Sequence, residues 1–200
     1  MMKHILLSVF AGILFASSAA LAQQAAPAAD ASAAPGRPEV HGVEDWFVRC
    51  FPVASPSPCD IFQEEDSQQS RQRILSVSIA YVPSMDRHAL QITVPLEMSI
   101  PKGLTIQADN YTSPVLKYRR CDRNGCYVEM AVDNALVEAL SKSGPAGKVN
   151  VVADNGKSYA LRFSLKGFAA AHDEMVTKAK AKAKPIAKTQ EAPPPAPATP

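Results

Sequence analysis

The side chains of this chain with the most distinctive chemistry are its four cysteines, Cys50, Cys59, Cys121 and Cys126. The spacing is C-x8-C for the first two and C-x4-C for the last two, with a long interval between the pairs. In an exported chain of this size, an even number of cysteines favours disulfides over free thiols. The short spacings favour the local pairs Cys50–Cys59 and Cys121–Cys126, each closing a small loop worth roughly 2–3 kcal/mol.

Three other uses of these thiols stay open. A redox pair is normally spaced C-x-x-C, so the second pair is too widely spaced for a thioredoxin-type motif. A zinc site can use four thiolates, but these spacings do not resemble a zinc knuckle. A catalytic thiolate needs an exposed or unpaired cysteine with a histidine partner. We expect structural disulfides at all four positions.

The remaining candidates for catalysis are His41, His88 and His172. None has a second histidine within one helical turn, and only the run His172-Asp173-Glu174 suggests a weak metal site. The chain contains no G-x-S-x-G elbow, H-E-x-x-H helix, phosphate-binding loop or G-x-G-x-x-G sequence. We therefore predict no catalytic residues, no bound metal, no cofactor, and a protein that is not an enzyme.

The elements that position these residues are mostly strands. Apolar and polar residues alternate with the two-residue period of half-buried strands, at 46–50, 73–82, 90–94, 126–132, 149–153 and 158–165. The dipeptide Asn155-Gly156 between the last two stretches predicts a tight hairpin. Many short strands with turn residues between them favour an antiparallel β-sandwich over a parallel α/β sheet.

One short helix is expected near the middle of the chain. Asp133 or Asn134 can cap its first turn, and Gly144-Pro145 supplies its end. Its apolar stripe consists of Leu136, Val137 and Leu140. The predicted fold class is thus all-β, a β-sandwich with one short helix and disordered termini.

Composition divides the chain into four parts. A basic start, an apolar run and the small-residue site Ala20-Leu21-Ala22 predict a signal peptide over residues 1–22. Ala and Pro dominate residues 23–41, which we predict to be a disordered spacer. The patterned domain covers 42–174, and residues 175–200 form an Ala/Lys/Pro-rich tail predicted to be disordered. The predicted location is the periplasm, with outer-membrane attachment or secretion as alternatives.

Charge and composition narrow the possible partners. The 200 residues are 46% hydrophobic and 20% charged, and 21 basic against 19 acidic residues give a net charge of +2. This near-neutral balance implies no specific binding of nucleic acid. No segment after the signal is long and apolar enough to span a membrane.

Two basic segments are candidates for contact with anionic lipid, lipopolysaccharide or cell wall. The first lies beside the second cysteine pair, and the second is a Lys-Ala repeat in the tail. Their residues are Lys117, Arg119, Arg120, Arg123, Lys178, Lys180, Lys182 and Lys184. The competing interpretation is a charged strand edge and a solubilising tail.

Four motifs, taken in order, carry a family resemblance. They are Asp45-Trp46-Phe47-Val48-Arg49-Cys50 with Cys59-Asp60-Ile61-Phe62-Gln63; Pro95-Leu96 with Ile100-Pro101-Lys102-Gly103-Leu104; Tyr118-Arg119-Arg120-Cys121 with Asn124-Gly125-Cys126; and Ser164-Leu165-Lys166-Gly167-Phe168. Over about residues 44–174 the chain resembles the invasion-associated locus B family. The resemblance implies an immunoglobulin-like β-sandwich exported by a Gram-negative bacterium, with no catalytic residues to carry over.

Three functional hypotheses follow from the sequence and this resemblance. The first is a non-enzymatic envelope protein that binds another protein or an envelope polymer through its surface. The second is a virulence-associated factor for host-cell invasion or adhesion, because founding members of the family are linked to entry into host red cells. The third is a periplasmic thiol-disulfide or stress-related protein, which needs at least one reducible cysteine pair.

Overall fold

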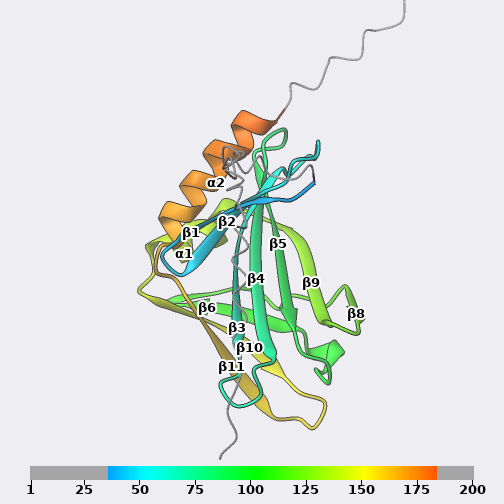
Figure 1. Cartoon of the computed structure of the whole chain (residues 1–200). Coiled ribbons are helices and arrows are strands. Elements are labelled where there is room, and N and C mark those ends of the chain that lie inside the picture. Colours follow the sequence, from blue (N-terminus) through cyan, green and yellow to red (C-terminus); the bar gives the residue numbers. More distant parts are fainter. Residues whose placement is uncertain (1–35, 184–200) are drawn as a thin grey trace, which may run out of the picture. The chain divides into compact units, whose positions relative to one another are not determined.

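The computed structural model describes residues 36–183, and within this part of the chain the strands form two antiparallel sheets (Figure 1). The larger sheet has seven strands in the order β1-β2-β3-β4-β5-β9-β8, and the smaller has four in the order β11-β10-β6-β7. The strands of the larger sheet are β1 (Glu39–Val43), β2 (Trp46–Cys50), β3 (Cys59–Asp66), β4 (Arg73–Val82), β5 (Arg87–Val94), β8 (Arg120–Asp122) and β9 (Gly125–Val132). Those of the smaller sheet are β6 (Leu104–Ala108), β7 (Tyr111–Thr112), β10 (Ala146–Val152) and β11 (Ser158–Ser164), and a 3-10 turn η1 (Ile100–Lys102) precedes β6.

The predicted antiparallel β-sandwich and its hairpin are confirmed. Strands β10 and β11 pair from Val152 opposite Ser158 back to Ala146 opposite Ser164. Gly156 in the connecting turn has a φ of 81°, a left-handed conformation that costs glycine little. The alternation along each strand sends one set of side chains inward and the other outward, as the two-residue period requires.

The core lies between the sheets and beneath the helices. Inward-facing residues of the larger sheet are almost fully buried, among them Trp46, Ile61, Ile79, Ile92 and Val128. Val149, Val151, Ile106 and Phe163 face them from the smaller sheet and belong to the same apolar cluster. Burial of these side chains is the main force that holds the two sheets together.

Helix α1 (Asn134–Lys142) forms where the sequence predicts it. The side chain of Asp133 accepts a hydrogen bond from the backbone N–H of Leu136, which satisfies one free donor of the first turn. The predicted apolar stripe of Leu136, Val137 and Leu140 is buried. This helix therefore follows directly from its cap and its one-sided hydrophobic pattern.

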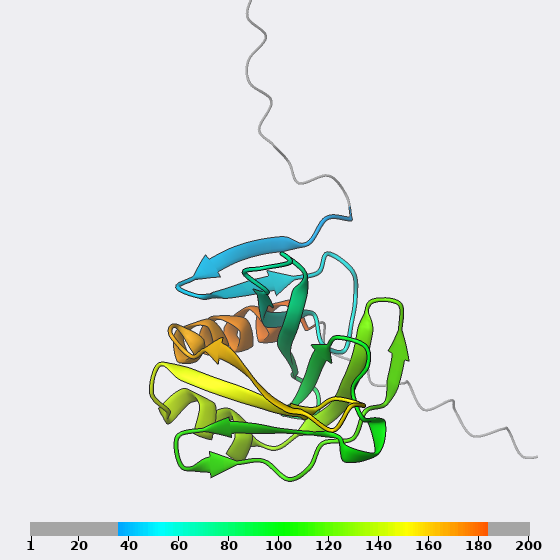
Figure 2. The ribbon, with the colours of Figure 1, turned by 90° about the horizontal axis from the view of Figure 1, so that it is seen from below.

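A second helix, α2 (Phe168–Lys182), corrects the prediction of one helix and of a disordered tail from residue 175. Phe168, Ala171, Met175 and Ala179 are fully buried at helical spacing. The Phe168 ring packs edge-on against Trp46, with ring centroids 5.1 Å apart. Figure 2 shows α2 between the β1–β2 hairpin and β11. Packing of this narrow stripe, half of it alanine, fixes the Lys-Ala repeat as helix to Lys182.

Strand β1 corrects the other boundary, because residues 39–41 belong to the sheet and not to the predicted spacer. It pairs with β2 from Glu39 opposite Cys50 to Val43 opposite Trp46. As an edge strand it is largely exposed, so it shows no alternating apolar pattern. The predicted signal peptide and residues 184–200 lie outside the described residues. No helix within residues 36–183 is both long and apolar enough to cross a membrane.

Candidate binding surface

Both predicted disulfides are present, and both link residues directly opposite each other on neighbouring antiparallel strands. Cys50–Cys59 joins β2 to β3, and Cys121–Cys126 joins β8 to β9. All four cysteines are therefore oxidised, and no thiol is free for zinc binding or nucleophilic attack. Cys50, Cys59 and Cys126 are buried, whereas Cys121 is exposed at the sheet edge.

The first and the last of the motifs that carry the family resemblance meet in one structural junction. The Trp46 Nε1–H donates to the carbonyl of Ser164 over 3.0 Å, which ties β2 to the end of β11. The Gln63 amide donates to the carbonyl of Asp45 and accepts from the backbone N–H of Ser164, at 2.6 and 2.8 Å. The Ser164 hydroxyl donates to the Asp45 carboxylate. These groups satisfy one another, so we assign the junction to fold stability.

The outer face of the seven-stranded sheet carries polar side chains in cross-strand rows. One row runs through Phe62, Ser78, Gln91 and Glu129 on β3, β4, β5 and β9. A second row runs through Asp60, Ala80, Ala89 and Ala131 on the same strands. A third is made of Glu64, Ser76, Thr93 and Tyr127. The middle of the sheet thus bears small side chains, flanked by larger ones.

Two adjoining hollows lie on this face, and we call them together the sheet groove. Their cavity volumes are about 420 and 300 Å³, and both are lined by Ser78 and Gln91. The larger hollow extends to Phe51 and Ala131, and the smaller extends toward Tyr127. The groove is open to solvent and runs along β4 and β5.

The wall of the groove at β2 and β3 is held by an ion pair. Arg49 lies directly opposite Asp60, and its Nε and Nη2 both donate to that carboxylate, the Nε bond being 3.0 Å long. The Ser78 hydroxyl also donates to Asp60, at 2.9 Å. The guanidinium of Arg49 lies 4.4 Å from the centre of the Phe62 ring. The hydrogen bond to Asp60 raises the pKa of Arg49, and charge-assisted bonds of this kind hold the two side chains in place.

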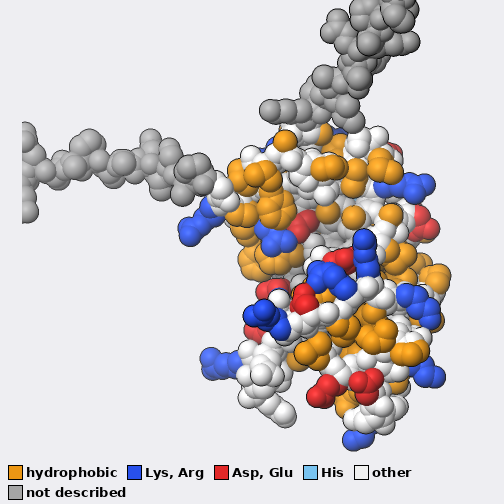
Figure 3. Space-filling view, turned by 90° about the vertical axis from the view of Figure 1, so that its right-hand side faces the viewer, with side chains coloured by type: hydrophobic (Ala, Val, Ile, Leu, Met, Phe, Trp, Pro, Cys, Tyr) orange, Lys and Arg blue, Asp and Glu red, His pale blue; other side chains and the backbone are white. Residues whose placement is uncertain are grey.

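The opposite wall, at β8 and β9, is built from the predicted basic segment. Arg120 stacks 3.7 Å from the centre of the Tyr127 ring and bonds to Asp122 and Glu129, at 2.6 and 3.0 Å. Arg119 lies 3.8 Å from Glu129. The backbone N–H of Asn124 donates a hydrogen bond to Asp122 and lowers the pKa of that carboxyl most. Hydrogen bonds from Tyr127 and Arg120 lower it further. Basic and acidic side chains alternate across the middle of this side of the molecule (Figure 3).

The structure therefore neutralises much of the basic segment that the sequence singles out. Lys117 donates to the carbonyl of Pro101 at 3.2 Å, and Arg123 lies exposed in the turn between β8 and β9. Arg119 and Arg120 face the acidic partners described above. Contact of this segment with an anionic surface stays a prediction, since only Arg119 and Arg120 of its four basic residues have acidic partners.

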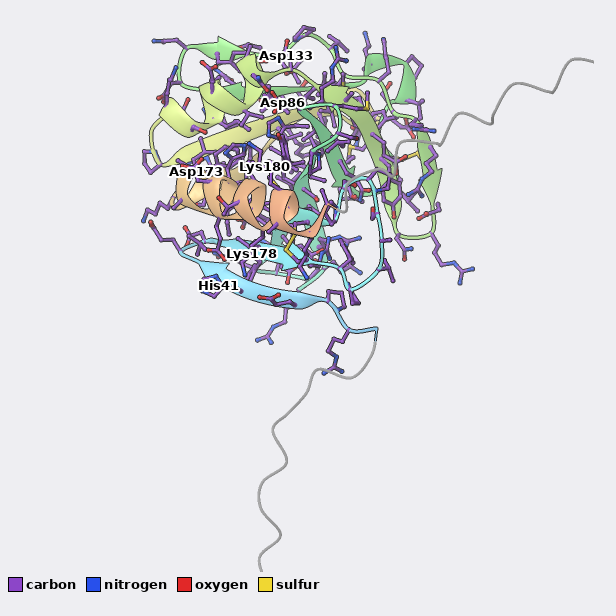
Figure 4. The ribbon with its side chains drawn as sticks, turned by 90° about the horizontal axis from the view of Figure 1, so that it is seen from above. His41, Asp86, Asp133, Asp173, Lys178 and Lys180 are labelled. Atoms are coloured by element: carbon purple, nitrogen blue, oxygen red, sulfur yellow. A yellow bond between two sulfur atoms is a disulfide. The ribbon has the colours of Figure 1, made fainter. Side chains whose placement is uncertain are left out.

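The tail lysines are placed by α2, except Lys184, which lies outside the described residues. Lys178 bonds to Glu39 of β1 at 3.0 Å, whereas Lys180 lies 5.5 Å from the centre of the Tyr81 ring. Figure 4 shows these two lysines on opposite sides of the helix, Lys178 toward β1 and Lys180 toward the side of Asp86 and Asp133. Lys182 lines a separate apolar hollow beside the β2–β3 loop.

Sequence reasoning missed one contact between titratable groups. His88 and His172, which are 84 positions apart, meet with their Nε2 atoms 2.9 Å apart. His41 instead lies 3.3 Å from Glu174. Among residues 36–183, no three His, Cys, Asp or Glu side chains form a set that could hold a metal ion. Only proximity in the folded chain reveals the histidine pair, since no local spacing signals it.

The fold and this surface define a disulfide-linked, two-sheet antiparallel β protein with a solvent-facing groove on its larger sheet. The model of the Invasion associated locus B (IalB) protein family matches residues 46–176, and the chain belongs to this family. Its relatives include the invasion protein B homologs of Brucella abortus strain 2308 and of biovar 1 strain 9-941. Each is 30% identical over 133 residues, which cover 66% of this chain and 76% of the relative.

A solved structure shows the same fold. It is the crystal structure of invasion associated protein B from Bartonella henselae, with a TM-score of 0.62 and 19% sequence identity. The match covers 71% of this chain and 99% of the Bartonella chain. The predicted family and fold class are confirmed by these comparisons.

Proposed function

We propose that this chain is an exported, non-enzymatic protein of the bacterial envelope that acts by binding a protein or an envelope polymer. The observation that carries the proposal is the sheet groove, whose two hollows of about 420 and 300 Å³ share Ser78 and Gln91. A concave face with convergent polar groups, held rigid by ion pairs, is typical of a binding site.

Export is supported by two independent features. The first 22 residues have the composition of a secretory signal. All four cysteines form disulfides, which persist in oxidising compartments such as the periplasm. These features support our proposal of the periplasm as its location, with attachment to the outer membrane or secretion as the alternatives.

A binding role is favoured over catalysis because the charged groups of the groove are committed to one another. The Asp60 carboxylate accepts from Arg49 and Ser78, and Glu129 accepts from Arg120. A general base needs a lone pair directed at the substrate, and a nucleophile needs an activating neighbour. These carboxylates instead hold the walls of the groove in place.

The test is binding of the purified protein to isolated cell envelopes of the source bacterium, measured by cosedimentation. Ala131→Arg places a long cation in the groove, because Ala131 is exposed and lines the larger hollow. Ala160→Arg is the matched control, since Ala160 is exposed on β11 of the other sheet. We expect loss of binding in A131R and retention in A160R. Equal binding by both variants would exclude the groove as the binding site.

A second candidate function is promotion of host-cell entry. It is favoured by the names of the relatives, which are invasion protein B homologs in Brucella abortus and invasion associated protein b in Bartonella henselae. This function requires display on the cell surface or secretion. Protease accessibility on intact cells, with reduced host-cell entry after deletion, would support it. Strictly periplasmic protein with unchanged entry would rule it out.

A further inference from the structure

The chemistry lining the sheet groove indicates which kind of molecule fits it. This inference rests on the proposed function, because it assumes that the groove binds a ligand. Its floor is made of side chains with hydroxyl, amide or methyl groups: Ser76, Ser78, Ala80, Ala89, Gln91 and Thr93. Their register places them side by side on β4 and β5, Ser76 opposite Thr93, Ser78 opposite Gln91 and Ala80 opposite Ala89. The hollow therefore exists because small residues occupy the centre of the sheet.

The charges around this floor are balanced within the protein. Arg49 is paired with Asp60, Arg73 with Glu64, and Arg120 with both Asp122 and Glu129. A charged ligand would have to compete with these pairs and would leave one member of a pair uncompensated. A ligand without charge can instead use the remaining donors and acceptors of Ser76, Gln91 and Thr93.

The two walls are aromatic rings whose positions are fixed by stacking. Phe62 stacks on Phe47 with ring centroids 5.4 Å apart and is covered on its other side by Arg49. Tyr127 is held under Arg120 on the far wall. Such stacks restrict rotamers before binding, which lowers the entropic cost of association. Because these ring faces are already covered, the apolar contacts left for a ligand are mainly the methyl groups of Ala80 and Ala89 on the floor.

We infer that the sheet groove binds an uncharged, hydroxyl-rich polysaccharide chain, which lies along β4 and β5 between the walls formed by Phe62 and Tyr127. The sugar rings pack against the floor methyl groups, and their hydroxyls exchange hydrogen bonds with Ser76 and Gln91. This ligand class differs from the anionic surfaces suggested by the basic residues of the sequence, of which Arg119 and Arg120 beside the groove face acidic partners in the fold.

The test is a titration of the isotope-labelled protein with cellotetraose and chitotetraose, followed by amide chemical shifts. Oligogalacturonate of equal length is the anionic comparator, and an extended neutral peptide is the second. We expect saturable shifts at Ser78, Gln91 and Thr93 with at least one uncharged sugar. Gln91→Arg and Ala131→Arg should weaken this binding at least about tenfold. Ala160→Arg, on the other sheet, should leave it unchanged.

Failure of this inference can be told apart from failure of the proposed function. If neither uncharged sugar shifts the groove amides but envelope binding is still lost in A131R, the groove binds another ligand class and the inference is wrong. Binding of oligogalacturonate or peptide alone, strengthened for the anion by Q91R, would also contradict the inference. If A131R changes neither sugar binding nor envelope binding, both the inference and the proposed function are wrong.

Discussion

The imidazole of His88, at the start of β5, lies against that of His172 on α2, with 2.9 Å between their Nε2 atoms. A hydrogen bond there requires one nitrogen to carry a proton and the other to accept it. His172 Nδ1 is 3.2 Å from the Asp173 carboxylate, so Nδ1 is the nitrogen of His172 that carries a proton. His172 Nε2 is then the acceptor between the rings, and His88 Nε2 is the donor. Among residues 36–183, His88 Nδ1 then has no hydrogen-bond partner. The contact between the two Nε2 atoms thus has room for one proton only.

This pair predicts that the protein loses stability as the solution becomes acidic. Burial lowers the pKa of His88 most, and the charge of His172 lowers it further. Asn134 and Asp86 raise it, but by less. The unfolded chain therefore binds a proton at a pH where the folded chain does not. The stabilisation is complete above the ordinary pKa of about 6.5 and is lost as pH falls through the lowered pKa. One such proton gives a slope of up to about 1.4 kcal/mol per pH unit.

The measurement is the free energy of urea unfolding from pH 7.5 down to 5. Wild-type protein should weaken over this range, and His88→Gln should flatten the decline. His41→Gln removes an exposed histidine and is the matched control. The charged groups that face the pair are Asp86 and Asp173, and the Tyr81 hydroxyl stays neutral because Asp86 raises its pKa to about 12. An unchanged slope in H88Q would contradict the assignment.

The strands could be predicted from sequence because burial repeats every second residue along them. Leu75, Val77, Ile79 and Tyr81 are all buried on one face of β4, and the alternating pattern reports this directly. Helix α1 was predictable for a similar reason, since its cap and apolar stripe are local. The groove was not predictable, because it depends on which residues of β3, β4, β5 and β9 stand opposite one another.

Besides the strands β3, β6, β7 and β8, for which no stretch was predicted, sequence reasoning missed β1 and α2, and these two lack a local signal. Strand β1 is stabilised by its backbone pairing with β2, so its side chains follow no pattern of burial. Helix α2 buries Ala171 and Ala179, which are too small to stand out against the alanines around them. Local sequence also fails to show which charges are paired. Four of the seven residues from 117 to 123 are basic, but folding brings Glu129 of β9 beside Arg119 and Arg120.

The junction between β2, β3 and β11 predicts a large cost for removing one amide. Gln63 is 4% exposed and links the carbonyl of Asp45 to the backbone N–H of Ser164. Gln63→Leu keeps a similar volume but leaves both of those groups without their partner. Since each unsatisfied group costs about 1–3 kcal/mol, we expect a loss of about 2–4 kcal/mol in the free energy of unfolding. Urea titration followed by Trp46 fluorescence measures it.

Gln69→Leu is the control for this change, because Gln69 is exposed in the turn between β3 and β4. It should alter stability by less than about 0.5 kcal/mol. A loss in Q63L no larger than in Q69L would show that the junction contributes nothing to stability. The shared motif residues would then need another explanation.

The two disulfides should differ in how readily they are reduced in the folded protein. Cys121 is exposed, whereas Cys50 and Cys59 are only 2% and 0% exposed. Exchange requires a thiolate to reach a sulfur atom, so access sets the order. We expect mild reductant to open Cys121–Cys126 first, detected by alkylation and peptide mass analysis without denaturant. Opening of Cys50–Cys59 first would mean that the β2–β3 end unfolds locally.

Two glycines with nearly the same backbone conformation test how α2 joins the sheet. Gly167 precedes α2 at a φ of 77°, and Gly156 turns the β10–β11 hairpin at 81°. A Cβ at Gly167 would lie 2.6 Å from the Val43 carbonyl oxygen, whereas one at Gly156 would meet nothing within 4 Å. Gly156→Ala should therefore cost only the left-handed backbone penalty, about 1–2 kcal/mol. Gly167→Ala should cost about 1–3 kcal/mol more, because β1 or α2 must also move.

The free energies of urea unfolding of the two variants are compared. Because the two glycines have nearly the same φ, the cost of placing alanine at a positive φ is similar in both and largely cancels in the difference. The close approach exists only if the end of β1 packs against the start of α2, two elements that the sequence pattern did not predict. Equal losses in G156A and G167A would mean that Val43 lies too far from the helix to obstruct an added methyl group. A larger loss in G167A would establish that β1 and α2 form one packed unit, because the added methyl group has no other backbone atom so close.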